Sequence, residues 1–125
     1  MLSFRSILVF SENPKKLADF YKEVFQKAPD MDEENFKGFM VGDGFITIGA
    51  HDKVHGKSLN PERIMINFET EEVKQEFERI KGIEGASVIA EPYEMGDENM
   101  KAWIATFADP DGNYFQLMTP WKGNK

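Results

Sequence analysis

The chain has 125 residues, a formal net charge of −7 and no cysteine. This length suits one domain whose core needs no disulfide or metal, and the missing cysteines exclude thiolate metal sites. The negative charge argues against nucleic acid or an anionic membrane as a partner, because phosphate groups would be repelled. Since we find neither a signal-peptide pattern nor the roughly 20 apolar residues of a membrane-spanning helix, we expect a cytoplasmic protein with no membrane partner.

The first half of the chain predicts a strand, a helix and a hairpin. Residues 6–10 form a β-branched and aromatic run that is typical of a buried strand. Asn13 can cap a helix, in which apolar side chains recur at helical spacing to about Gln26. After weak strand signals, residues 36–41 and 45–50 flank a glycine-rich turn and predict a hairpin.

The same order of elements then starts again. Residues 63–68 predict a strand, and Thr70 opens a helix that has acids in its first turn and Gly82 as its stop. Further strands are predicted at about residues 86–90, 100–108 and 114–119. The last two flank a tight turn, in which Asp109 accepts local backbone hydrogen bonds and Gly112 supplies a left-handed residue.

A strand, a helix and three strands therefore occur twice in a single domain, residues 1–125. The modules lie at about 1–51 and 62–121, and a linker at 52–61 joins them. One module cannot bury both faces of its sheet alone. We therefore expect an α+β fold, in which two βαβββ modules form a curved, mostly antiparallel sheet of about eight strands around a concave cavity, with the helices outside. The linker permits pairing within one chain or between two exchanged modules.

Alternation along the predicted strands separates two sets of side chains. One set is apolar and should pack beneath the helices: Ile7, Val9, Ile46, Ile48, Ile64, Ile66, Phe68, Phe115 and Leu117. The other set mixes aromatic, thioether and polar groups, as the lining of a ligand cavity does. A half-exposed sheet or a dimer surface would carry the same mixture. Trp103, at the head of its strand, either stacks on a ligand or packs in the core.

Residues 7–21, together with the turn at 109–112 and the strand through Gln116-Leu117, resemble the glyoxalase/bleomycin-resistance/dioxygenase family, also called vicinal oxygen chelate proteins. In metal-dependent members, His, Gln or Glu side chains from four strands hold one divalent ion. The resemblance places these positions on Ser6, Thr47, Arg63 and Gln116. Hydroxyls and a neutral amide are weak ligands, and a guanidinium cannot coordinate and repels the ion. We therefore predict no metal and no cofactor.

Two further features are loop-like in the sequence. His51 and His55 have the spacing of a helical metal pair, but the linker around them has no helical pattern, so we expect exposed loop side chains. Acidic residues gather at 30–34 and 91–98, which we also expect to be loops. These loops are either solvated surface or a rim that attracts a cationic ligand.

The resemblance implies a homodimer that binds an unknown small molecule by sequestration, without chemistry. The predicted ligand contacts are Ser6, Phe10, Phe45, Thr47, Arg63, Asn67, Trp103, Tyr114 and Gln116. Arg63 favours an anionic or carbonyl-bearing ligand. Two other functions stay open: a glyoxalase-like lyase or isomerase with a non-standard or absent metal site, and an interaction protein whose open sheet face mainly serves dimerisation or another protein. We find no nucleophile motif and no phosphate-binding glycine loop, and we assign no catalytic residue.

Overall fold

The computed structural model describes residues 1–99 and 101–120, and the chain divides into two compact units, Met1–Lys57 and Ser58–Lys125. The division falls within the segment that the sequence marks as a linker. Met100, the predicted start of one strand, and residue 121, the predicted end of the second module, lie outside the described residues. No helix among the described residues is long and apolar enough to span a membrane.

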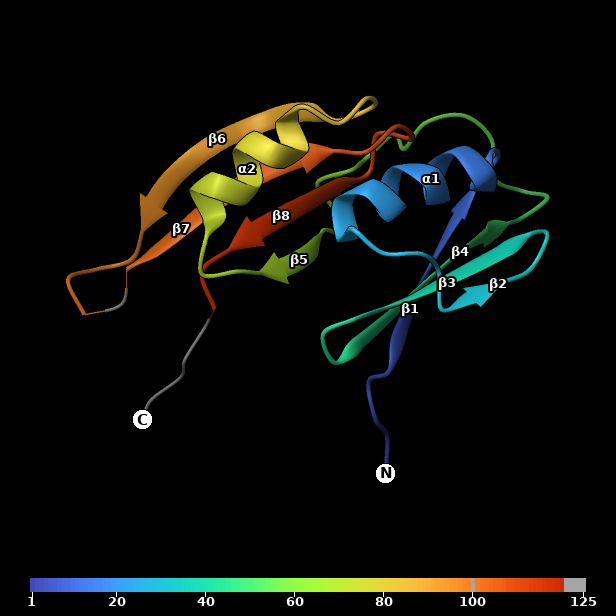
Figure 1. Ribbon diagram of the computed structural model, residues 1–125, viewed down its shortest axis with the longest axis horizontal. Coiled ribbons are helices and arrows are strands. Elements are labelled where there is room, and N and C mark those ends of the chain that lie inside the picture. Colours follow the sequence, from blue (N-terminus) through green and yellow to red (C-terminus); the bar gives the residue numbers. More distant parts are fainter. Residues whose placement is uncertain (100, 121–125) are drawn as a thin grey trace. The chain divides into compact units, whose positions relative to one another are not determined.

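The first unit holds one sheet of four strands and one helix (Figure 1). Its elements are β1 (Ser6–Ser11), α1 (Pro14–Phe25), β2 (Met31–Asp32), β3 (Phe36–Val41) and β4 (Gly44–Ala50). The strand order in this first sheet is β1-β4-β3-β2. Strand β1 runs parallel to β4, and the other neighbours are antiparallel.

The second unit repeats this arrangement. Its elements are β5 (Ile66–Glu69), α2 (Val73–Lys81), β6 (Ser87–Met95), β7 (Ala102–Ala108) and β8 (Tyr114–Met118). The order in this second sheet is β5-β8-β7-β6, again with one parallel pair, β5 and β8. The predicted α+β fold with two βαβββ modules and mostly antiparallel strands is therefore confirmed, whereas the cavity stays a prediction.

The helix boundaries follow the capping residues. The Asn13 side chain accepts a hydrogen bond from the first turn of α1, and Gln26 ends this helix in a left-handed conformation with φ 56°. In the second unit the Thr70 hydroxyl accepts from the Glu72 amide at 3.0 Å, but α2 begins only at Val73, after the N-cap residue Glu72, whose side chain makes no capping hydrogen bond. Gly82 ends α2 with φ −82°, so this stop does not depend on the left-handed freedom of glycine.

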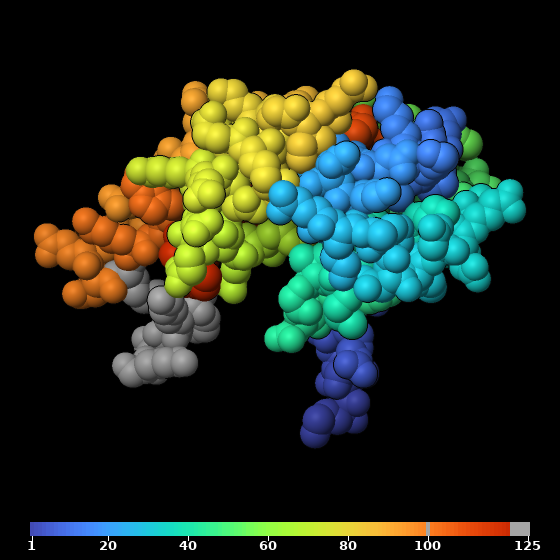
Figure 2. All heavy atoms as spheres, in the orientation of Figure 1, coloured from blue at the N-terminus to red at the C-terminus, as the bar shows by residue number. Residues whose placement is uncertain are grey.

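Each helix covers one face of its own sheet (Figures 1 and 2), where α1 is drawn in blue and α2 in yellow. In the first unit the ring of Phe25 lies edge-on to Phe39, with centroids 5.3 Å apart. In the second unit Phe77 of α2 stacks on Phe107 of β7 at 5.1 Å. Apart from Ile64, the predicted apolar set lies on these faces, where Ile46, Ile48, Phe115 and Leu117 are buried. This part of the prediction is confirmed.

Two predicted boundaries of the second unit are wrong. Strand β5 begins at Ile66, because the Arg63 amide donates to the Asn60 carbonyl at 3.1 Å and closes a turn there. Ile64 lies in this segment and is 72% exposed, so it is not part of the core. Strand β6 continues to Met95, so the acidic stretch from residue 91 is strand rather than loop as far as that residue. As an edge strand, β6 tolerates both Pro92 and exposed acids.

Candidate functional site

The face of the first sheet turned away from α1 carries no charged residue on its described strands. Its strand residues are Ser6, Leu8, Phe10, Met31, Phe36, Gly38, Met40, Phe45, Thr47 and Gly49. They alternate with Phe39, Ile46 and Ile48, which are buried on the side of α1. We call this surface the helix-free face of the first sheet. It is mainly apolar, because rings and thioethers outnumber its two hydroxyls.

Two aromatic rings on this face lie directly against glycines of neighbouring strands. A Cβ atom on Gly38 would come within 2.6 Å of the Phe45 ring, and one on Gly49 within 2.8 Å of the Phe36 ring. The rings therefore occupy the space that a side chain would fill. Leu8 and Met40 beside them are 56% and 49% exposed. The result is an aromatic surface with accessible apolar margins, which suits contact with an organic ligand.

Replacing Gly38 with alanine should displace the Phe45 ring and cost about 1–2 kcal/mol of stability, because a rigid ring has to leave an occupied position. Urea unfolding would measure the loss, and the nuclear Overhauser effects between the Phe45 ring and residue 38 should weaken. Gly44→Ala is the matched control, since its Cβ would meet only the Val41 carbonyl oxygen at 3.6 Å. Equal stability of the two variants would contradict the packing of Phe45 on Gly38.

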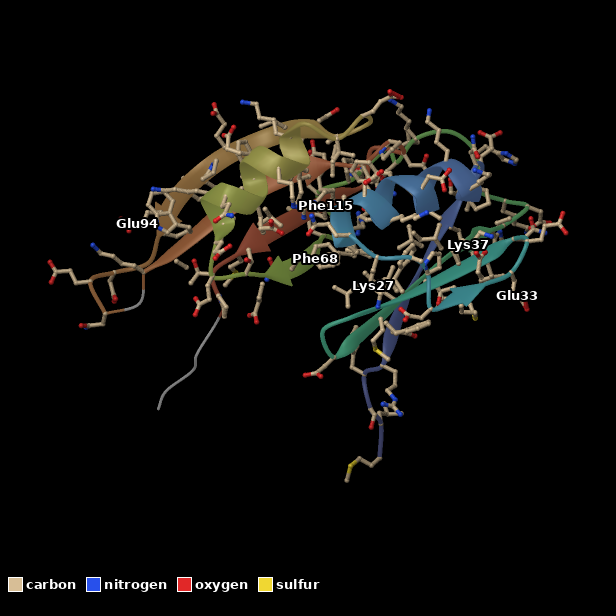
Figure 3. All side chains as sticks on the ribbon, viewed as in Figure 1. Lys27, Glu33, Lys37, Phe68, Glu94 and Phe115 are labelled. Atoms are coloured by element: carbon tan, nitrogen blue, oxygen red, sulfur yellow. The ribbon has the colours of Figure 1, made fainter. Side chains whose placement is uncertain are left out.

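Lys27 and Asp30 hold Met40 at the edge of the first sheet. The Lys27 ammonium donates to the Met40 carbonyl at 2.8 Å, and the Met40 amide donates to Asp30 Oδ2 at 2.7 Å. Lys27 reaches β3 in Figure 3 and pairs with Asp30 at 2.8 Å. The hydrogen bond from Lys27, and then that from the Met40 amide, holds the pKa of Asp30 below its usual range. This arrangement satisfies a strand edge and positions Met40 on the helix-free face.

His51 lies beside the helix-free face of the first sheet, a position that the sequence analysis missed. Its ring lies edge-on to Phe10, with centroids 5.2 Å apart, and its Nδ1 accepts from the Lys53 amide at 3.1 Å. The sequence signal that predicts this position is the alternation of side chains along β4, which continues from Phe45 through Gly49 to His51.

His55 lies in an exposed loop, as predicted. Its Nδ1 is 3.6 Å from Glu12 Oε2, and the side chain is 70% exposed. Glu12 also accepts from the Gly56 amide at 3.0 Å. The Gly56 hydrogen bond and then the one from His55 lower the pKa of Glu12. These two histidines therefore make separate local contacts rather than one metal pair.

The face of the second sheet turned away from α2 is polar at its centre. Asn67, Gln116 and Thr106 stand side by side in register on β5, β8 and β7. Gln116 Nε2 donates to Asn67 Oδ1 at 3.2 Å, and Asn67 Nδ2 donates to the sulfur of Met118 at 3.4 Å. We call Asn67, Gln116 and Thr106 the amide row. On β5, β7 and β8, Glu69 is the one charged residue of this helix-free face.

The predicted ligand contacts separate into groups. Ser6, Phe10, Phe45 and Thr47 lie on the helix-free face of the first sheet. Asn67, Tyr114 and Gln116 lie on that of the second sheet. How far either group contacts a ligand stays a prediction.

Trp103 and Arg63 lie elsewhere. The Lys74 ammonium of α2 sits 3.8 Å from the centroid of the Trp103 ring, so this tryptophan is on the helix-covered face, opposite Glu94 in register. Arg63 is exposed in the turn before β5. The strand alternation that placed Arg63 on the ligand side was therefore wrong.

The residues at the family's metal positions do not fit a divalent ion. Ser6 and Thr47 offer hydroxyls, and Gln116 offers only a neutral amide oxygen. Such groups lack the carboxylate or imidazole character of ordinary metal ligands. In the part of the chain that the structure describes, no three His, Asp or Glu side chains form a group that could hold a metal ion.

The family model of the glyoxalase-like domain matches residues 6–118. A search of curated proteins gave no match.

Several solved structures are similar. A glyoxalase/bleomycin resistance protein/dioxygenase family enzyme from Burkholderia phytofirmans PsJN has 22% sequence identity and a TM-score of 0.71, and the match covers 91% of this chain and 95% of that chain. A glyoxalase/bleomycin resistance protein from Albidiferax ferrireducens T118 has 15% identity and a TM-score of 0.74, with 94% and 98% covered. A glyoxalase-related enzyme from Fulvimarina pelagi has 15% identity and a TM-score of 0.74, with 96% and 89% covered. At these identities the likeness shows the fold.

Proposed function

Because this chain belongs to the glyoxalase-like domain family, we propose that it binds a small, uncharged organic molecule on the helix-free face of its first sheet, without a metal ion of its own. The family expected from residues 7–21 and the turn at 109–112 is thereby confirmed, and the ligand is the proposal. The homodimer and the cytoplasmic location that the sequence suggests are part of the same proposal.

The observation that carries the proposal is the lack of charge on the helix-free face of the first sheet. Charged residues make up 30% of the chain, yet this face presents rings, thioethers and hydroxyls. A charged ligand would lose its hydration there without gaining an opposite charge, which is costly. An uncharged ligand with apolar area and a few hydrogen-bonding groups avoids this cost. Because Arg63 lies in a turn, it no longer favours an anion.

An enzyme of the family is the competing function. The structures from Burkholderia phytofirmans and Fulvimarina pelagi are named as enzymes, although their low identity extends only the fold to this chain. The amide row could polarise a carbonyl group by hydrogen bonding, but it holds no carboxylate or imidazole that would act as a general base.

Native mass spectrometry of the freshly purified protein tests the proposal. We expect a small organic adduct and no stoichiometric divalent ion, even after incubation with Mn²⁺, Ni²⁺ and Zn²⁺. Thr47→Arg should abolish the adduct, because it places an unpaired charge at the centre of the uncharged face. Ser3→Arg adds the same charge at an exposed position before β1 and should retain the adduct. One bound metal ion per chain, or an adduct that survives Thr47→Arg, would contradict the proposal.

A further inference from the structure

The hydrogen bonds of the amide row have a defined direction. A thioether sulfur can only accept, so the Asn67 nitrogen has to face Met118 and the Asn67 oxygen has to face the other way. That oxygen accepts from Gln116, which fixes the Gln116 nitrogen on the side of Asn67. Met118 thus assigns both amide orientations.

The direction leaves specific groups available for a ligand. A glutamine amide has two N–H donors and one acceptor oxygen, and a single N–H is used here by Asn67. Among the described residues, neither Gln116 Oε1 nor the Thr106 hydroxyl has a hydrogen-bond partner. Gln116 therefore offers one donor and one acceptor side by side, next to a hydroxyl that can do either.

We infer that the amide row recognises an uncharged cis-amide edge, as in a lactam, an imide or a carboxamide. Such a group places its own N–H and C=O side by side, so it can donate to Gln116 Oε1 and accept from Gln116 Nε2. A carboxylate has acceptors only and would face the Gln116 oxygen unfavourably, and an ammonium group has no acceptor. This inference concerns the second sheet alone and goes beyond the proposed function, which is carried by the first sheet.

Side-chain NMR with three probes tests the inference. The probes are 2-piperidone, which has a cis-amide edge, N-methyl-2-piperidone, which lacks the donor, and acetate, which only accepts. We expect 2-piperidone to shift the ¹H–¹⁵N signals of the Gln116 and Asn67 side chains, and the other two probes to bind about tenfold more weakly, as the loss of about one hydrogen bond predicts.

Two variants test the role of the direction. Gln116→Glu keeps the size but removes the donors, and should weaken 2-piperidone binding about tenfold. The matched control is Gln75→Glu, the same substitution on the exposed surface of α2, which should leave binding unchanged. Met118→Leu removes the sulfur acceptor at similar volume, so the preference for 2-piperidone over acetate should fall.

The outcomes separate the inference from the proposed function. Equal shifts by 2-piperidone and its N-methyl derivative would overturn the reading of the amide edge, while the native mass spectrum could still show the organic adduct. The absence of any shift at Gln116, or full binding in Gln116→Glu, would also overturn it. A metal-loaded native spectrum would contradict the proposed function whatever the probes do.

Discussion

Phe107→Ala should lower the free energy of unfolding by about 4 kcal/mol, because it removes the central ring of the second unit's core. The Phe107 side chain is fully buried. Its ring stacks on Phe77 at 5.1 Å and on Phe115 at 5.5 Å, and Phe68 lies edge-on to Phe115 at 6.0 Å (Figure 3). Removing the middle ring deletes two aromatic contacts at once and leaves a cavity between α2 and the sheet. Urea unfolding followed by circular dichroism would measure the loss.

Tyr93→Ala is the matched control for this prediction. Tyr93 is an aromatic residue on β6 of the same sheet and is 45% exposed, so its removal should cost about 1 kcal/mol or less. Hydrogen exchange of the α2 and β8 amides should accelerate strongly in Phe107→Ala alone. If the two variants unfolded at the same urea concentration, the three-ring stack would not be the core of this unit.

Local signals were sufficient for most of the fold. The cap at Asn13, the spacing of the apolar residues in α1 and the turn between β3 and β4 depend on neighbours in the sequence, and all three are present. The start of β5 was wrong because the hydrogen bond from Arg63 to Asn60 overrides the strand propensity of the apolar residues that follow. The acidic composition from residue 91 onward suggested a loop. Strand β6 nevertheless continues to Met95, because an edge strand can carry exposed acids.

The candidate site was predictable only as far as strand alternation reaches. Phe10 and Thr47 share one face of the first sheet, and Asn67 and Gln116 share one face of the second, as expected, because each step along a strand reverses the side chain. Trp103 has the same parity as the buried Phe107, so this rule would also have placed it on the helix side. The close approach of Phe45 to Gly38 joins different strands and needs the register, which the sequence does not state.

The turn after β7 should be the second most sensitive position, and Asp109→Ala should destabilise the protein by about 3 kcal/mol. The Asp109 carboxylate is 3% exposed and organises the turn. Its Oδ1 accepts from the amides of Asp111 at 2.9 Å and Asn113 at 3.0 Å, and its Oδ2 accepts from Asn113 Nδ2 at 3.1 Å. Alanine would leave these donors without an acceptor beside a buried strand end.

The Asp109→Asn variant separates the shape of this residue from its hydrogen bonds. Asparagine keeps one acceptor oxygen for the two backbone amides but turns an N–H toward the Asn113 amide group, so its loss should be about half that of alanine. Gly112 lies in the same turn with φ 82°. Because both variants weaken this turn, hydrogen exchange of the Asp111 and Asn113 amides should accelerate in both, and more in Asp109→Ala. If Asp109→Ala were as stable as the unchanged chain, the turn would be held by Gly112 and the β7–β8 ladder alone.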